Sequence, residues 1–409
     1  MRFVRAGGAI LLWTVIALCL AVTVIPHFMD RIYYRGATSG HFDGARFFNP
    51  DGDDDRLNAS GAGGRAGFLW RQIWGDPDKP AWPEHVAVTR TKPPARVSDG
   101  RMLATWVGHA TLLVQADGVN ILTDPVWSNH AGPLGMGPKR VAAPGIAFED
   151  LPKIDVILVS HNHYDHMDLA TLKRLWERDK PVIVTSLGND AILRGAGIEA
   201  IALDWGSAVS LTDHGAELED GIPRCDPFGA CPDDRATVHV TRNHHWDSRW
   251  FADRNRALWS SFVVKLPHGN FFFAGDTGLG DGKWPAEAMA LGPVRLAAIP
   301  IGAFRFAPRQ MASGSHVGPR DAIRVWDGLG RPFAVPIHWG TFRLSWEAYD
   351  TPPMMLRAMQ GCAKADPARF AARRIGAPFE VPPLGAAPPA PDLAALAACE
   401  QAGRFDRFR

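Results

Sequence analysis

Four side chains of the kinds that bind metal ions lie within six residues of one another: His161, His163, Asp165 and His166. Imidazole nitrogens and carboxylate oxygens are the usual protein ligands of zinc. The alternate residues His161 and His163 can serve one ion, and Asp165 with His166 can serve a second. Neither pair completes a tetrahedral zinc site, so each needs a further ligand from elsewhere in the chain.

Candidates for the remaining ligands follow three other apolar segments. They are the adjacent pair His244 and His245, Asp276 in a Gly-Asp-Thr turn, and His338 after an apolar run. Strand ends that are buried rarely carry polar side chains without a use for them. The pattern therefore predicts a metal centre rather than scattered surface histidines.

Short apolar runs must position these side chains. A strand expected over 154–159 leads into the histidine cluster, and Ala116-Asp117-Gly118 is expected to turn a hairpin. Helical spacing follows over 169–176, and a helix with proline at its first position is expected over 319–326. Further strands are expected over 102–107, 111–115, 119–123, 182–185, 237–241, 261–265, 271–274, 296–300 and 333–337. Strands interleaved with helices indicate an α/β layered domain.

The chain divides into four parts by composition. Residues 7–26 carry no charge over 20 residues, which predicts a transmembrane anchor within residues 1–30. A cleaved signal peptide and a buried core helix are the alternatives. Residues 31–100 are rich in glycine and proline without a sustained period, so an irregular extension is expected there. The main domain is expected over 101–345, followed by a C-terminal extension over 346–409.

Net charge and aromatic content indicate which classes of binding partner the protein can have. The 44 basic and 43 acidic residues leave a net charge of +1, which provides no field to attract nucleic acid. No nucleic-acid partner is therefore expected. Fifteen tryptophans and 21 phenylalanines favour an apolar substrate or a neighbouring membrane.

Cysteine usage bears on the compartment. Four cysteines lie outside the apolar segment: Cys225, Cys231, Cys362 and Cys399. An even number in a chain with an export signal fits two disulfides in an oxidising compartment, which places the main domain outside the cytoplasm. Three pairings are open, and the close pair Cys225 and Cys231 is expected to bond. Four free thiols remain the alternative.

These motifs together resemble a known family. The spaced histidine and aspartate set resembles the metallo-β-lactamase fold of dinuclear metallohydrolases. A longer set, in the same order along the chain, resembles N-acyl phosphatidylethanolamine phospholipase D. It comprises Trp106-Val107-Gly108-His109-Ala110-Thr111, Thr123-Asp124-Pro125, Gly137-Pro138-Lys139-Arg140, Ser160-His161-Asn162-His163-Tyr164-Asp165-His166, His245-Trp246, Phe272-Phe273-Ala274-Gly275-Asp276-Thr277, Ala298-Ile299-Pro300-Ile301-Gly302-Ala303 and Ile337-His338-Trp339-Gly340-Thr341-Phe342.

The resemblance implies an αββα sandwich with two metal ions at one edge. The ions would be zinc, with iron or manganese as alternatives. The implied ligands are His161, His163 and His245 for the first ion, Asp165, His166 and His338 for the second, and Asp276 as the bridge. His245 is preferred to His244 because the family pattern is histidine followed by tryptophan.

The expected activity is that of a membrane-anchored, zinc-dependent phosphodiesterase of the phospholipase D type, with N-acyl phosphatidylethanolamine or a related phospholipid as substrate. Two adjacent metals lower the pKa of a shared water and neutralise charge on a phosphodiester. The alternatives are a metallohydrolase acting on a soluble lactone or small phosphodiester, and a metal-stabilised binding protein without activity.

Additional residues receive roles from their motifs. Asp165 and His316 are the candidate catalytic residues, although Gly318 stands where relatives carry an acidic residue, so a structural helix-entry role for His316 stays open. Lys139 and Arg140 are the candidates for contact with the substrate phosphate. His109 is expected to hydrogen-bond a metal ligand rather than bind metal.

Overall fold

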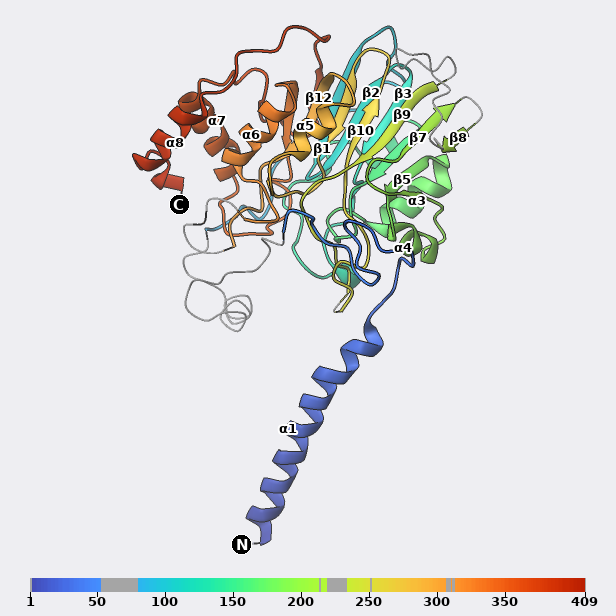
Figure 1. Ribbon diagram of the computed structural model, residues 1–409, viewed down its shortest axis with the longest axis vertical. Helices are drawn as coiled ribbons and strands as arrows, with labels where there is room; N and C mark the ends of the chain where they lie inside the picture. Colours follow the sequence, from blue (N-terminus) through green and yellow to red (C-terminus); the bar gives the residue numbers. More distant parts are fainter. Residues whose placement is uncertain are drawn as a thin grey trace.

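The computed structural model describes residues 2–52, 80–212, 215–218, 234–250, 252–306, 310 and 313–408. Two β-sheets pack face to face, and helices cover their outer faces (Figure 1). Each sheet contains seven of the described strands. The order is β14-β1-β2-β3-β4-β5-β6 in the first sheet and β13-β12-β11-β10-β9-β7-β8 in the second. The predicted α/β sandwich is thus confirmed.

The strands are short and mostly buried. Those of the first sheet are β1 Met102–Gly108, β2 Thr111–Ala116, β3 Val119–Thr123, β4 Val156–Val159, β5 Val182–Ser186, β6 Ile201–Leu203 and β14 Pro378–Glu380. Those of the second are β7 Ala208–Thr212, β8 Gly215–Leu218, β9 Asp234–Thr241, β10 Ser261–Lys265, β11 Asn270–Phe273, β12 Val294–Pro300 and β13 Phe333–Ile337. The helices are α1 Arg2–Met29, α3 Leu169–Asp179, α4 Asn189–Gly195, α5 Trp284–Met289, α6 Pro319–Gly328, α7 Thr351–Ala363 and α8 Leu393–Gln401.

Local sequence explains the elements that were predicted. The β2–β3 hairpin turns at Asp117 and Gly118, which both have positive φ, as a two-residue turn of this type requires. All four residues of β4 are buried, as expected for a short apolar run covered on both faces. Asp168 caps the N-terminus of the α3 helix, because its carboxylate accepts hydrogen bonds from the backbone N–H groups of Ala170 and Thr171.

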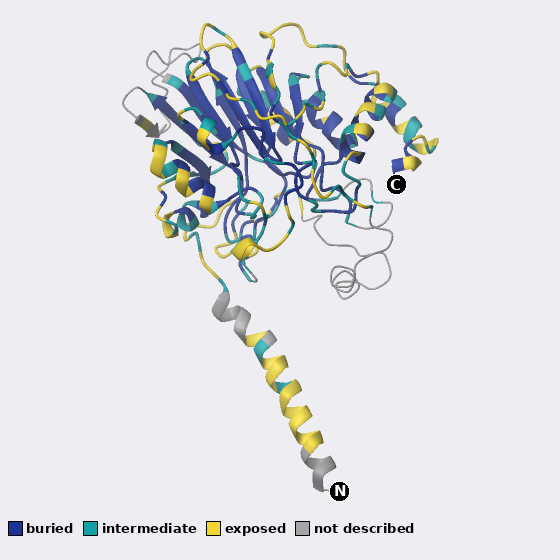
Figure 2. Cartoon of the chain, turned by 180° about the vertical axis from the view of Figure 1, so that it is seen from behind, coloured by how far each residue is buried: buried dark blue, intermediate teal, exposed yellow. Residues whose placement is uncertain are grey.

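The core has three layers. Side chains of both sheets meet in a central cluster that includes Val114, Leu158, Phe262 and Phe273. A second cluster lies between the first sheet and helices α3 and α4, and a third lies between the second sheet and helices α5 to α8. Figure 2 shows this buried interior as a continuous band through the strands.

The N-terminal segment forms the helix α1, which projects from the sandwich (Figure 1). Spanning a bilayer takes about 20 consecutive apolar residues in a helix. Within the part of the chain that the structure describes, no helix combines the length and the apolar character needed to cross a membrane. The predicted transmembrane anchor is therefore not supported.

Residues 31–52 form an irregular segment on the sandwich surface, held by isolated β-bridges. Phe42 and Phe47 are buried against Leu258 and Trp259, so the segment has its own apolar contact with the main domain. Residues 53–79 lie outside the described residues.

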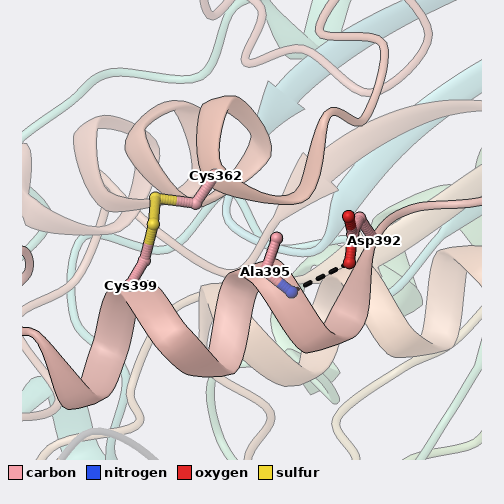
Figure 3. The surroundings of a disulfide bond; sticks show 4 residues. All are labelled: Cys362, Asp392, Ala395 and Cys399. Carbon is pink, nitrogen blue, oxygen red and sulfur yellow. Dashed lines mark hydrogen bonds between the residues drawn. A yellow bond between two sulfur atoms is a disulfide. The ribbon is translucent and has the colours of Figure 1, made fainter.

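The C-terminal residues complete both the first sheet and the helical layer. Strand β14 pairs with β1 in antiparallel register. A disulfide joins Cys362 in α7 to Cys399 in α8, next to the Asp392 side chain that accepts the Ala395 backbone N–H (Figure 3). The expected Cys225–Cys231 bond lies outside the described residues.

Strand direction brings the predicted site residues together. Strands β3 to β6 run parallel, as do β11 to β13, so their carboxyl ends point to the same edge of the sandwich. The loops after β4, β9, β11 and β13 carry the candidate ligands. One edge of the sandwich is consequently lined with metal-binding side chains.

Candidate metal centre

The candidate ligands converge in two adjoining groups. In each group one ligand atom per residue lies within 4.8 Å of the others. The first contains His161, His163 and His245, and the second contains His109, Asp165, His166 and His338. Asp276 joins the second group, because its Oδ2 lies 3.1 Å from Nε2 of His166 and 3.0 Å from Nε2 of His338.

Ser160 sets the orientation of His161. The Ser160 hydroxyl donates its proton to Oδ2 of Asp124 at 2.6 Å, so at 2.9 Å it accepts the Nδ1 proton of His161. The lone pair of His161 Nε2 then accepts the Nδ1 proton of His163 at 2.8 Å. A metal ion at this place would take over that lone pair in place of the proton.

Asp124 also orients His166. Its Oδ2 lies 2.6 Å from Nδ1 of His166 and accepts that proton. Nε2 of the same ring points to Asp276 and, at 3.4 Å, to Oδ2 of Asp165. Asp124 is fully buried, as expected for a carboxylate that fixes the tautomer of a metal-binding histidine.

The two adjacent histidines point to different neighbours. Nδ1 of His245 donates to the backbone carbonyl of Ser315 at 2.8 Å, and its ring packs against that of His161. Nδ1 of His244 pairs with Oδ1 of Asp51 at 2.9 Å. The structure thus turns His245 toward the cluster and ties His244 to the N-terminal segment.

His338 and His109 approach from opposite sheets and are linked through the backbone. The His338 backbone N–H donates to the carbonyl of His109 at 3.0 Å, and the His109 N–H donates to Oγ1 of Thr341. Both histidines have positive φ, which is uncommon for residues other than glycine. His109 Nε2 lies 2.9 Å from Oδ2 of Asp165, which is the hydrogen bond predicted for it.

A second set of contacts clamps the loop that carries the histidine cluster. The side chain and the backbone N–H of Asn162 both donate to the buried carboxylate of Asp247. Arg249 donates from Nη1 to the carbonyls of Asn162 and Met167, and its guanidinium lies over the Tyr164 ring. The segment after His245 therefore holds the 161–167 loop at several points.

The first group of histidines is electrically neutral. Burial lowers the pKa of His161 and His245 well below 6.5 and that of His163 to about 4. All three rings accordingly keep a lone pair at neutral pH, which metal binding requires.

In the second group, two carboxylates raise the pKa of two histidine rings. Burial acts to lower the pKa of His338, but Asp276 and Asp165 raise it to about 9. Asp276 and Asp165 likewise raise the pKa of His166 well above its usual range against the effect of burial. Burial would raise the pKa of Asp276, yet the two histidines hold it well below 3.8. Positive charge is thus favoured between these carboxylates.

The donor set fits metal ions. Nε2 of His245 and Oδ1 of Asp276 are buried, and neither has a hydrogen-bond partner among the residues that the structure describes. Such atoms cost free energy unless something satisfies them. Imidazole and carboxylate ligands of this kind suit divalent zinc, iron or manganese.

The remaining predicted residues lie at different distances from the cluster. Nδ1 of His316 is 3.6 Å from Oδ2 of Asp276, and its ring packs against His245. Arg140 is buried and donates to the carbonyls of Ser128, Val126 and Ala142. Lys139 is exposed on the same loop. The structure brings His316 to the cluster and uses the Arg140 guanidinium to hold a loop.

Sequence reasoning missed the residues that hold the ligands in place. Asp124 stood in a recognised motif at a strand end, so its position before Pro125 was a usable signal. Asp247 carried no such signal, because its partner Asn162 is 85 residues away in the chain.

Comparison with known proteins agrees with this geometry. Residues 119–339 match the family described as "Beta-lactamase superfamily domain". The chain is 33% identical to "N-acyl-phosphatidylethanolamine-hydrolyzing phospholipase D 1" of Caenorhabditis elegans, over 63% of this chain and 68% of that protein. It is 28% identical to the mitochondrial phospholipase D of the same description from Saccharomyces cerevisiae, over 62% of this chain and 51% of that protein.

Among solved structures, the isothiocyanate hydrolase from Delia radicum gut bacteria superposes with a TM-score of 0.50 and 17% identity, covering 68% of this chain and 99% of that one. This likeness concerns the fold alone. The family match covers more than half of the chain, and the matched residues include all seven candidate ligands. The chain therefore belongs to the beta-lactamase superfamily domain family, and it is a metal-dependent hydrolase with the metallo-β-lactamase fold.

Proposed function

We propose that this protein is a zinc-dependent phosphodiesterase of the phospholipase D type that hydrolyses N-acyl phosphatidylethanolamine or a related phospholipid. The observation that carries the hydrolytic part is the position of Asp276, whose carboxylate lies beside His166 and His338 of the second group and also groups with His245 of the first. The lipid substrate rests on the printed names of the two relatives, which are 33% and 28% identical.

The proposed ligands divide between two zinc ions. His161, His163 and His245 would hold the first, Asp165, His166 and His338 the second, and Asp276 would contact both. When bound, such a pair of ions supplies Lewis acidity, which neutralises charge on a phosphodiester and lowers the pKa of water.

The chain's own residues keep this donor set in place. Asp124 and Ser160 fix the tautomers of His166 and His161, so that both Nε2 atoms face the cluster. His109 holds Oδ2 of Asp165, the oxygen that faces His166 and His338. His316 lies beside Asp276, where its ring can donate a hydrogen bond to a phosphate oxygen.

An assay with competing substrates tests the proposal. Purified, metal-loaded protein receives vesicles containing N-acyl and plain phosphatidylethanolamine, a soluble lactone and a small cyclic phosphodiester in parallel. We expect release of phosphatidic acid from the N-acyl lipid to be the fastest reaction. Faster hydrolysis of either soluble compound would show that the substrate is soluble rather than a lipid. The assignment of the metal centre would be unaffected.

Variants separate the metal centre from general damage to the protein. His163→Ala should abolish turnover because it removes a ligand. His268→Ala is the matched control, since His268 is an exposed histidine that pairs with Asp117 at the β2–β3 turn. Gly318→Asp, which restores the usual residue of the resembling family, should preserve turnover.

The compartment is a further part of the proposal. The Cys362–Cys399 disulfide supports an oxidising environment for the catalytic domain. Peptide mapping of the native protein without reductant should recover the two peptides linked, and recovery of two free thiols would place the domain in a reducing compartment.

A further inference from the structure

An apolar loop lies beside the segment that carries the histidine cluster. Residues 131–138 read Ala-Gly-Pro-Leu-Gly-Met-Gly-Pro and contain no charge. Leu134 is 94% exposed, the highest value for a large apolar side chain among the described residues, and Met136 is 57% exposed. In Figure 1 this loop lies in turquoise at the lower end of the sandwich.

The loop holds Leu134 outward in a conformation that costs free energy. Leu134 has φ 54° and ψ 30°, in the left-handed region that non-glycine residues avoid. An exposed leucine side chain and a strained leucine backbone each cost free energy. Where both occur at one residue, the conformation indicates a functional segment.

The base of the loop is built to keep this shape. The Ala131 N–H donates to the carbonyl of Pro138 at 3.0 Å, and the Met136 N–H donates to that of Pro133 at 2.9 Å. A Cβ added at Gly137 would lie 2.8 Å from the Ala131 carbonyl oxygen, so the two arms approach too closely for a side chain there. Just after the loop, the Arg140 side chain donates to the carbonyls of Val126, Ser128 and Ala142, which fixes the chain on both sides of the loop.

The loop lines a cavity together with the segment that carries the histidine cluster. The cavity measures about 410 Å³, and Pro133, Leu134, Tyr164 and Arg249 are among its lining residues. Tyr164 lies in the chain between His163 and Asp165, the partly exposed stretch of the cluster. The loop therefore shares a cavity with the segment that carries four of the candidate ligands.

We infer that the 131–138 loop docks this hydrolase on a phospholipid bilayer, with Leu134 and Met136 entering the boundary between headgroups and acyl chains. Two side chains present far less than the roughly 1,000 Å² that a specific protein interface buries, whereas apolar side chains that enter a bilayer give reversible binding. The exposed Lys139 at the base of the loop adds a positive charge suited to a surface of phosphate groups. The choice of lipid as partner rests on the proposed function.

The full-length protein tests this inference with a fluorescent label. A cysteine replaces Leu134 in a Cys19→Ser background, because Cys19 is an exposed free thiol. An environment-sensitive dye is attached, and vesicles of phosphatidylcholine and phosphatidylethanolamine are added. The matched control is Leu384→Cys, an apolar residue 44% exposed in the segment after β14. Both signals are corrected for the parental protein without an added cysteine.

We expect a blue shift and protection from aqueous quenchers at position 134 and none at position 384. The double variant Leu134→Ser with Met136→Ser should also lower the ratio of the vesicle rate to the rate on a soluble nitrophenyl phosphodiester by about tenfold or more. Met354→Ser, another exposed apolar residue, should leave this ratio unchanged. A label at 134 that stays in water, or one shielded only by raising the protein concentration, would overturn the inference.

Failure here is distinguishable from failure of the proposed function. If position 134 enters vesicles but no N-acyl lipid is cleaved, the substrate assignment is wrong and the membrane-docking inference is supported. If the lipid is cleaved in vesicles while position 134 remains in water, the docking inference is wrong and the substrate assignment is supported.

Discussion

Replacing Asp247 with alanine should weaken both the fold and the metal centre. The Asp247 carboxylate is fully buried and accepts two hydrogen bonds from Asn162, one from the side chain and one from the backbone. Asn162 separates His161 from His163, so the clamp joins the loop after β4 to the segment that follows His245.

The expected magnitude follows from the two donors that lose their acceptor. A buried donor left without a partner costs about 1–3 kcal/mol. Burial also raises the pKa of Asp247 well above its usual range, so removing the carboxylate relieves part of a desolvation cost. The unfolding free energy should therefore fall by about 2–4 kcal/mol. Asp247→Asn keeps one acceptor oxygen and should lose about half as much.

Urea unfolding of the chelator-treated protein measures the change in stability, and competition with a chromophoric chelator measures metal affinity. Asp43→Ala is the matched control, because the Asp43 carboxylate also accepts two N–H groups, from Ala45 and Arg46, but in an exposed loop where water replaces it. It should cost less than about 1 kcal/mol. Wild-type stability and metal affinity in Asp247→Ala would refute the reasoning.

Three further predictions concern the metals, the pH and the disulfide. Metal analysis should find two ions per chain, and Asp276→Ala should lower this to one or none; one ion or fewer in the wild type under excess zinc would contradict the two-ion site. Burial raises the pKa of Glu347 above 4.5, so its contribution to stability is full below that pH and declines as the pH rises through the folded-state pKa. Above pH 4.5 the unfolding free energy of the wild type should therefore fall relative to that of Glu347→Gln. Parallel curves for the two proteins would show that Glu347 does not cause the pH dependence. Reducing the Cys362–Cys399 bond, which closes 37 residues, should cost about 3–4 kcal/mol in denaturant unfolding, whereas an unchanged midpoint would show that the bond leaves stability unaffected.

Local pattern was enough for most of the sheet elements. The expected strands over 119–123, 261–265 and 333–337 match β3, β10 and β13, because short apolar runs bounded by turn residues can be read without distant contacts. The expected strand over 154–159 begins later, at Val156. Strand β14 and helices α7 and α8 were not predicted. A three-residue strand and the alanine-rich α8 have weak patterns. The division into four parts stays a prediction.

The sequence by itself determined which side chains could bind metal, because ligand chemistry depends on residue type and spacing within one loop. Only the tertiary structure decided how they are held. It turned His245 toward the cluster and His244 toward Asp51, and it used the Arg140 guanidinium for loop carbonyls. These outcomes depend on groups that lie far apart in the chain and meet only after the two sheets have packed, so no local pattern encodes them.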